Sequence, residues 1–294
     1  MPSMDVFQTS GAFTMRSLTA AINVPDYTAG QVTASGIFSE AGLNTTKVSL
    51  ERLAPSVGTV ASTPRGAAPI QRDSDVRSMY DLNMVRVAIQ DVVYADELLN
   101  VRAFGSEDGV KALAAEVQMR MDNMAASIAA THEWMRVTAL KGETLDGDGT
   151  TSLIDSSQVF SISDQASHEI DTDSTTNGEV RGQIAAAIRK IEAGLKGRNY
   201  TGLTCYCDGT FFDNLVGNVD VRDTFVYSEG QSLRDRTAGR SIFMGGVNFV
   251  EYRNQSGRVP FAAGKGVIVP EGVDNLFLSR FGPADFSSSI GGVG

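Results

Sequence analysis

The sequence predicts an α+β fold, and three observations support this class. Apolar residues recur at spacings of three and four from Gly105 to about Lys141, which is the pattern of one long amphipathic helix. Short runs between Phe243 and Phe286 alternate apolar and polar residues and are separated by Gly and Pro, as in strands joined by turns. Residues 1–43 show neither pattern, so we expect a long extended segment as well.

Length and charge limit the classes of protein that this chain can represent. It has 294 residues, enough for one large or two medium domains with their own cores. Its formal net charge is -10, whereas proteins that grip nucleic acid through phosphates need clustered Lys and Arg. A dedicated nucleic-acid-binding protein is therefore disfavoured. Because the sequence has no secretory signal and no window of about 18 apolar residues, we expect neither export nor a membrane span.

The first 91 residues predict an arm followed by a hairpin. Residues 1–43 carry one short apolar patch, Leu18–Asn23, and must either stay disordered or lie on another surface. The alternating runs Thr46–Glu51 and Val85–Ile89 predict the two strands of a long hairpin, with Pro and Gly residues between them. An isolated hairpin of this length is unstable in water, so it requires a neighbour, for which another subunit is the candidate.

The longest predicted helix runs from Gly105 to about Lys141. Ser106 is its predicted N-cap, and Gly142 is predicted to end it. About 35 residues at 1.5 Å per residue give a length of about 50 Å, which is typical of a spine lying across a sheet. Its apolar stripe consists of Val110, Leu113, Val117, Met121, Met124, Ile128 and Met135.

The remaining elements are shorter. The run Leu145–Thr150 predicts a hairpin turn rather than a calcium loop, because Ser157 stands where an EF-hand needs its bidentate Glu. Residues 164–179 are acidic and rich in Ser and Thr, which predicts a solvated linker. We then expect a helix at Val180–Leu195 ended by Gly197, a strand at Leu203–Cys207, a helix at Phe211–Val216, a polar loop at Ser228–Ser241 and the strands between Phe243 and Phe286.

The sequence offers little catalytic chemistry. His132 and His168 belong to no nucleophile motif and are interpreted as solvated or incidental, and no Gly-x-Ser-x-Gly elbow or phosphate-binding loop is present. The two cysteines, Cys205 and Cys207, are too few for a disulfide framework or a zinc site, which predicts buried thiols in a reducing compartment.

Close carboxylate pairs are also present in the sequence. With 35 acidic residues, pairs such as Asp96 with Glu97 or Asp171 with Asp173 arise by chance, and a solvated surface explains them. We therefore predict no catalytic residue, no metal site and no cofactor.

Eight short strings occur in a fixed order along the chain. They are Leu18–Pro25, Thr46–Arg52, Thr63–Gly66, Ile89–Asp91, Gly245–Arg253, Pro270–Val273, Leu276–Phe277 and Phe281–Phe286. In this order and spacing they resemble the lambda-type major capsid protein family of tailed bacteriophages (Caudoviricetes), also called capsid protein E. The resemblance covers most of the chain. It implies the Hong Kong 97 fold, a phage capsid fold of the α+β class.

The resemblance also implies a division of the chain. The parts are an N-terminal arm (1–43), an extended β-hairpin loop (44–91), a peripheral domain with a long spine helix (92–163), an axial domain (164–275) and a return to the peripheral domain (276–294). The family pattern usually continues into a further strand after the point at which this sequence ends, at Gly294.

The function implied by the resemblance is assembly without catalysis. Copies of the chain are expected to form hexamers and pentamers that tile an icosahedral shell, which encloses double-stranded DNA without sequence-specific contact. Because no long helical N-terminal extension is present, a separate scaffolding protein is expected, together with a portal and, as a further candidate, a decoration protein. The expected location is the virion, after assembly in the host cytoplasm, with no membrane.

Candidate contacts between subunits come from the arm, the hairpin and the polar loop. The arginines of the loop are expected to bridge a ring of subunits, to touch packaged nucleic acid, or to lie in solvent, and the last alternative is favoured narrowly. The candidates are Leu18, Ile22, Val48, Leu50, Arg52, Arg65, Arg72, Arg234, Arg236 and Arg240.

Two other functions are compatible with the composition. An encapsulin-like protein compartment would share the fold but would enclose protein cargo in place of a genome. A soluble α+β hydrolase would use one of the carboxylate pairs and would be a compact monomer or dimer. Removal of residues 1–43 separates these readings, because it should leave such an enzyme folded and should abolish assembly of a shell subunit.

Overall fold

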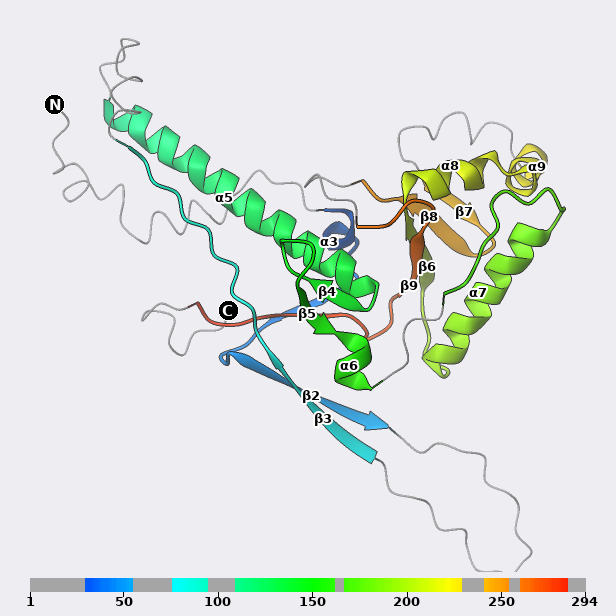
Figure 1. Ribbon diagram of the computed structural model, residues 1–294, viewed down its shortest axis with the longest axis horizontal. Helices are drawn as coiled ribbons and strands as arrows, with labels where there is room; N and C mark the ends of the chain where they lie inside the picture. The colour runs from blue at the N-terminus through cyan, green and yellow to red at the C-terminus, as the bar shows by residue number, and fades with distance from the viewer. Residues whose placement is uncertain are drawn as a thin grey trace, which may run out of the picture.

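The computed structural model describes residues 30–54, 76–94, 109–161, 167–228, 241–253 and 260–284. Its described elements are helices and strands in a mixed order, which confirms the α+β class. Figure 1 shows the long helix α5 (Gly109–Leu140) on one side and a second group, built from a sheet with helices α7, α8 and α9, on the other.

Helix α5 confirms the predicted spine and its predicted end. The helix ends at Leu140, and Gly142 follows with φ of 92°, a left-handed conformation that Gly adopts without strain. Among the side chains of α5 that the structure describes, from residue 116 on, the deeply buried apolar ones lie in the last turns, at Trp134, Val137 and Leu140. The predicted N-cap Ser106 and the first predicted helical residue, Gly105, lie outside the described residues.

A small hairpin and a short helix follow α5. Strands β4 (Glu143–Leu145) and β5 (Ser152–Asp155) pair antiparallel and lead into α6 (Ser156–Phe160), so the predicted hairpin turn is confirmed. The carboxylate of Asp148 accepts hydrogen bonds from the Thr150 and Thr151 amides and from the Thr151 hydroxyl. These bonds hold the pKa of Asp148 well below its usual range and explain the turn without a calcium ion.

A four-stranded sheet forms the centre of the second group. Its order is β7 (Ser241–Met244), β8 (Val247–Glu251), β6 (Gly202–Cys207) and β9 (Gly266–Glu271), with β6 parallel to β8 and antiparallel to β9. The predicted strand at 203–207 is thus confirmed as the buried central strand. Because side chains alternate across a strand, Cys205 and Cys207 face one core while Tyr206 faces another.

The two faces of this sheet are covered by different elements. Helices α7 (Glu179–Leu195), α8 (Gly209–Gly217) and α9 (Val219–Ser228) enclose one face, in agreement with the helices predicted at 180–195 and 211–216. The other face packs on the end of α5 and on the short helix α3 (Gln31–Ser35). We call this second cluster the junction core; its buried members are Val32, Val137, Leu140, Tyr206, Phe261 and Val269.

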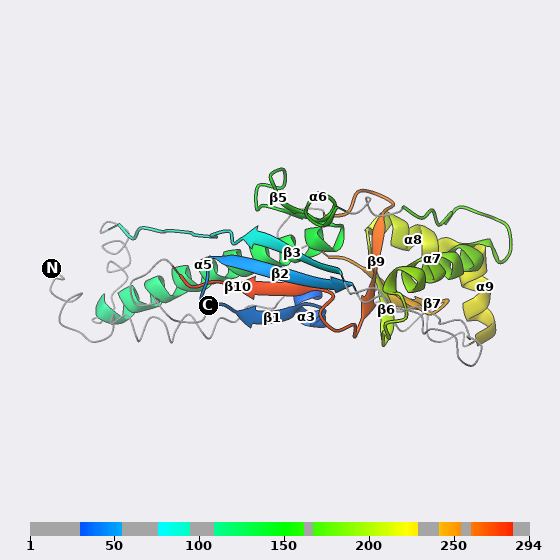
Figure 2. The ribbon, with the colours of Figure 1, turned by 90° about the horizontal axis from the view of Figure 1, so that it is seen from below.

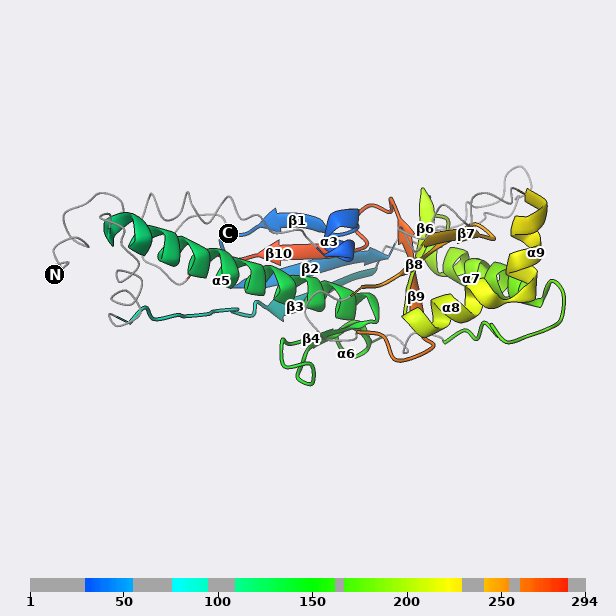
Figure 3. The same cartoon turned by 90° about the horizontal axis from the view of Figure 1, so that it is seen from above.

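Four strands lie along α5 on the other side of the molecule. Strand β1 (Ser39–Gly42) pairs parallel with β10 (Leu278–Phe281), and β2 (Lys47–Ala54) pairs antiparallel with β3 (Val76–Asn83). Figures 2 and 3, from opposite sides, show these two pairs next to each other beside the helix. Strand β10 therefore returns the chain to the elements around α5.

Of the predictions for the first 91 residues, one is wrong and one can be followed from residue 30. The return strand of the hairpin is Val76–Asn83, not Val85–Ile89, because β2 begins at Lys47 opposite Asn83 and the preceding residues turn away toward β1. The arm was expected either to stay disordered or to lie on another surface; its described part does the latter, because α3 and β1 pack on the rest of the chain and Val32 is fully buried, while residues 1–29 lie outside the described residues.

Two phenylalanines on neighbouring strands give a matched test of this packing. Phe249 on β8 is 0% exposed, whereas Phe243 on β7 is 64% exposed. We expect Phe249→Ala to lower the free energy of unfolding by about 3–5 kcal/mol through the cavity it leaves. Phe243→Ala is expected to change it by no more than about 0.5 kcal/mol. Urea unfolding of the free subunit measures both, and equal losses would contradict the described sheet.

Candidate functional site

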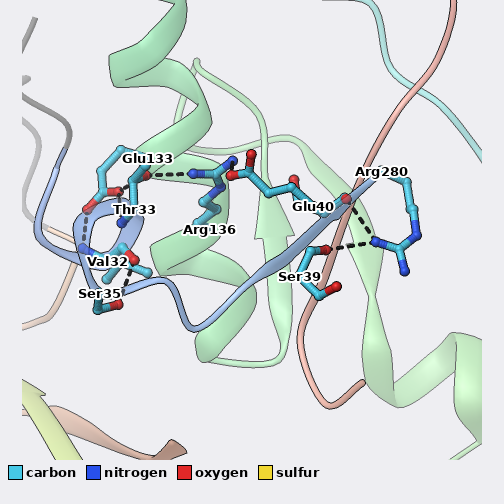
Figure 4. Close-up of polar contacts among 9 residues, drawn as sticks. Val32, Thr33, Ser35, Ser39, Glu40, Glu133, Arg136 and Arg280 are labelled. Atoms are coloured by element: carbon cyan, nitrogen blue, oxygen red, sulfur yellow. Dashed lines mark hydrogen bonds and ion pairs between the residues drawn. The ribbon is translucent and has the colours of Figure 1, made fainter. Parts of the chain in front are cut away.

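The carboxylate of Glu133 on α5 caps helix α3 from outside. Its two oxygens accept hydrogen bonds from the amides of Val32 and Thr33 at 2.9 and 2.8 Å and from the Thr33 hydroxyl. The residue before α3 is Gly30, which offers no side chain for this purpose. Figure 4 shows the Glu133 side chain reaching the first turn of α3. A charge on one helix therefore satisfies the free amides of another helix.

The same carboxylate also reaches the sheet. Tyr252, which follows β8, donates its hydroxyl to Glu133 at 3.2 Å. Glu133 is only 5% exposed, and these four hydrogen bonds offset the cost of burying its charge. A Cβ at Gly30 would lie 2.1 Å from the Glu133 side chain, so only Gly permits the close approach.

Arg136, one turn later on α5, extends this polar cluster to strand β1. Its guanidinium donates to the Thr33 hydroxyl at 2.8 Å and pairs with the Glu40 carboxylate. Arg136 is 7% exposed, so this pair is screened little by solvent on the arginine side. Arg280 on β10 donates to the Ser39 carbonyl across the neighbouring strand pair, as Figure 4 also shows. We call Glu133, Arg136, Thr33 and Glu40 the polar junction.

The hairpin β2–β3 has two unlike faces. Lys47, Ser49 and Glu51 alternate on the exposed face, whereas Val48 and Leu50 lie on the half-buried face opposite Leu82 and Tyr80. The Tyr80 ring contacts Phe160 of α6 edge-on, with ring centroids 5.1 Å apart. The half-buried face is thus directed partly toward the chain's own α6.

Segment 84–94 leads from β3 toward α5 and carries exposed apolar side chains. Arg120 on α5 fixes this segment by donating to the carbonyl of Val92 at 3.0 Å and pairing with Asp91 at 3.3 Å. The exposed apolar residues along it are Val85, Ile89, Val92 and Tyr94, and Met119 on α5 is exposed as well. Apolar surface of this kind is typical of contact with another molecule.

The structure describes only part of the predicted contact set. Val48 and Leu50 lie on one face of β2, and Arg52 lies on the same strand, where only its backbone is described. Outside the described residues are Leu18, Ile22, Arg65, Arg72, Arg234, Arg236 and Arg240.

The described histidines and cysteines, which are residue types that often serve in catalysis, make structural contacts. His132 is half-buried and packs against Phe281 with ring centroids 5.6 Å apart, so of the two interpretations, solvated or incidental, the packing favours the incidental one. His168 lies 2.7 Å from the Gln183 carbonyl and 3.3 Å from the Lys190 ammonium, which ties the acidic linker to α7. Cys205 and Cys207 are free and buried, as predicted, and a side-chain hydrogen bond with Cys207, together with burial, raises the pKa of the Cys205 thiol.

Among the residues that the structure describes, no three His, Cys, Asp or Glu side chains gather in a way that could hold a metal ion. Within those ranges, no helix combines the length and hydropathy that a membrane span needs.

The polar junction was not predicted from the sequence. Glu133 and Arg136 are charged residues within a helix, and such residues normally lie in solvent. Their partners in α3 and β1 are about 100 positions away, with 100 between Glu133 and Thr33 and 96 between Arg136 and Glu40. A local pattern therefore carries no signal for this cluster.

Comparison with known proteins decides the family. The family model described as phage major capsid protein E matches residues 14–294. The chain belongs to this family. A search of curated proteins found no significant match.

Solved structures are similar to the chain at low identity. A capsid structure of the cyanophage P-SCSP1u matches with 11% identity and a TM-score of 0.41, covering 84% of this chain and 75% of that chain. A structure from Mycobacterium phage Che8 matches with 14% identity and a TM-score of 0.39, covering 79% of this chain and 72% of that chain.

Membership of the capsid family confirms the resemblance on which the functional expectation rested. Together with the mixed helix and strand architecture, it confirms the Hong Kong 97-type capsid fold. The function expected from the resemblance, a major capsid protein of a tailed phage, is confirmed by the same match. Neither the compartment shell nor the hydrolase is favoured by it.

The polar junction predicts a specific loss of stability. Glu133→Ala leaves the Val32 and Thr33 amides without their acceptor, so we expect the free energy of unfolding to fall by about 3 kcal/mol or more. The control Glu169→Ala, at an exposed position, is expected to change it by no more than about 0.5 kcal/mol. Urea unfolding of both variants tests this, and a similar small effect for both would refute the role of Glu133.

His132 predicts a pH dependence. Burial, and then the nearby Arg136 guanidinium, lower the pKa of His132 below its usual 6.5, while Glu40 opposes this shift. The unfolded chain then binds the proton more readily, so His132 favours the folded state fully above pH 6.5 and progressively less as the pH falls toward its lowered pKa.

The difference between wild type and His132→Gln isolates this contribution. We expect wild type to lose more free energy of unfolding than His132→Gln between pH 7 and pH 5. Urea unfolding at several pH values measures the difference. Parallel curves for the two proteins would show that His132 does not titrate as described.

Proposed function

We propose that copies of this chain assemble as pentamers and hexamers into the icosahedral shell of a tailed phage, around its double-stranded DNA. The observation that carries the proposal is the family match over residues 14–294. The proposed location is the virion, after assembly in the host cytoplasm. We also propose that the protein has no catalytic activity, a reading supported by a structural family and by the ordinary roles of its histidines and cysteines.

The fold provides physical support for a subunit that needs neighbours. A hairpin of two strands is marginal in water by itself, and here Tyr80 of β2–β3 contacts Phe160 of α6. In a shell, neighbouring copies supply the missing contacts, and binding to the folded state stabilises it. The net charge of -10 agrees with a wall that encloses DNA without gripping it.

The proposed domains follow the described elements. The β2–β3 hairpin is the proposed extended loop, α5 with the strands beside it the peripheral domain, and the sheet with α7, α8 and α9 the axial domain. The arm of the original division, 1–43, contributes α3 and β1 to the folded body, so the proposed free arm ends before Gly30.

Partners other than copies of the chain complete the proposal. They are a separate scaffolding protein, a portal and a decoration protein. The proposed contact residues remain Leu18, Ile22, Val48, Leu50, Arg52, Arg65, Arg72, Arg234, Arg236 and Arg240.

Two truncations separate the arm from the folded body. Removal of residues 1–43 deletes Val32, Glu40 and strand β1, so we expect an unfolded or aggregated subunit. Removal of residues 1–29 retains every contact among the described residues, so we expect a folded subunit that no longer forms shells. Circular dichroism measures folding, and negative-stain microscopy of each chain, co-expressed with the scaffolding protein, measures assembly.

The wild-type chain provides the reference for this experiment. We expect it to form closed shells under the same conditions. A wild-type chain that stays a compact monomer under all assembly conditions would contradict the proposed function. Shells that enclose only protein, even when viral DNA is supplied, would favour the compartment.

A further inference from the structure

Helix α7 has acidic side chains at its beginning. Asp171 and Asp173 lie in the linker that precedes the helix, and Glu179 is its first residue. All three residues are exposed. The linker is fixed here, because the Asp171 amide donates to the Gln183 side chain of α7 at 2.7 Å. Figure 1 shows this end of α7 beside α9. We call Asp171, Asp173 and Glu179 the acidic patch.

The other end of α7 is basic. Arg189 lies in the second half of the helix, and Lys196 and Arg198 follow its last residue, Leu195. All three cationic residues are exposed. Among the described residues, none of the three side chains has an ion pair or a hydrogen bond. We call Arg189, Lys196 and Arg198 the basic patch.

The ends of α7 are too far apart for their charges to neutralise each other within one chain. The helix has 17 residues, so at 1.5 Å per residue it is about 25 Å long. Exposed charges are screened over about 8 Å at physiological ionic strength. The helix dipole favours an acidic residue such as Glu179 in the first turn, but it does not explain Arg189, which lies more than one turn before the end.

The basic patch contrasts with the acidic character of the whole chain. The net charge is -10, yet residues 189–198 contain four basic residues and one acidic residue, Glu192. The Glu192 carboxylate accepts a hydrogen bond from the Tyr200 hydroxyl at 2.9 Å. Residues 169–179, by contrast, contain four acidic residues and neither Lys nor Arg. Patches of opposite charge are the surfaces by which protein partners select one orientation.

We propose that the basic patch of one copy contacts the acidic patch of the next copy around a pentamer or hexamer. The proposal rests on the proposed function and names one contact within its rings. A ring of identical chains needs a head-to-tail contact, in which two different surfaces of the chain meet. Helix α7 supplies two different surfaces of opposite charge within the proposed axial domain.

A second copy complements both patches, whereas DNA complements one. The phosphates of DNA would attract the basic patch and repel the acidic patch on the same helix. An acidic partner protein would meet the same repulsion. An identical chain carries both charges at the same spacing, so it can neutralise each patch in turn. Because two chains of net charge -10 otherwise repel each other, this contact also directs them into one orientation.

Reversal of either patch tests the contact. Arg189→Glu with Arg198→Glu makes both patches acidic, and Asp171→Lys with Asp173→Lys makes both basic. We expect each double variant to lower the yield of shells about tenfold or more, because like charges then meet between copies. Negative-stain microscopy after co-expression with the scaffolding protein measures the yield. The two variants shift the net charge in opposite directions, so a loss in both does not follow from net charge.

The chain with all four reversals is the matched control. Its net charge equals that of wild type, and its two patches have exchanged signs, so opposite charges meet again. We expect its yield of shells to lie within about threefold of the wild-type yield. If the basic patch instead contacts DNA or the scaffolding protein, the four reversals leave the yield as low as the two arginine reversals do.

Urea unfolding of the free subunits separates contact between copies from contact within one chain. Changes at distant sites without shared partners add, so the two double reversals should shift the urea midpoint additively in the free subunit. In the yield of shells they should instead compensate each other. The cycle is repeated with Arg198→Glu and Asp173→Lys alone if a double variant does not fold.

The outcomes distinguish this contact from the proposed function. Wild-type chains that never form shells overturn both. Wild-type shells together with a four-reversal chain that does not assemble overturn the contact alone, as do reversals of either patch that assemble like wild type. Reversals that compensate each other already in the free subunit show that the patches interact within one chain, and this result also overturns the proposal.

Discussion

The buried carboxylate of Glu133 is the interaction on which the arrangement of the described elements depends. It satisfies the first turn of α3, accepts the Tyr252 hydroxyl and lies one turn from Arg136, which holds Thr33 and Glu40. An ionised group is buried at low cost only when its hydrogen-bonding capacity is filled. Segments around residues 32, 136 and 252 must therefore be in place together, and the long helix, the N-terminal segment and the sheet form one body.

The described fold combines a sheet whose two faces are covered with strands whose edges have no described partner. Both faces of the sheet around β6 are covered by the chain itself, through α7, α8 and α9 on one side and the junction core on the other. By contrast, β3 pairs only with β2 among the described strands. A phage capsid protein needs this combination, because one body must meet neighbours through edges that its own fold leaves open.

The sequence predicted the elements whose signal is local. Helix α7, strand β6 and the turn around Asp148 follow from periodicity and turn residues, and the structure confirms them. The return strand was misplaced at Val85–Ile89, because this run alternates more regularly than Val76–Asn83 and alternation does not show whether a partner lies opposite. The burial of Val32 and the polar junction depend on contacts across about 100 residues, which no local pattern shows.

Amide hydrogen exchange at residues 87–90, compared between free subunits and shells, tests the central claim that the fold is completed by its neighbours. The claim predicts that the amides from Val87 to Gln90 exchange rapidly in the free subunit and about tenfold or more slowly in the shell. The amides of Leu203–Cys207, which are paired within the subunit, should exchange slowly in both. Equally rapid exchange of Val87 to Gln90 in both states would contradict the claim.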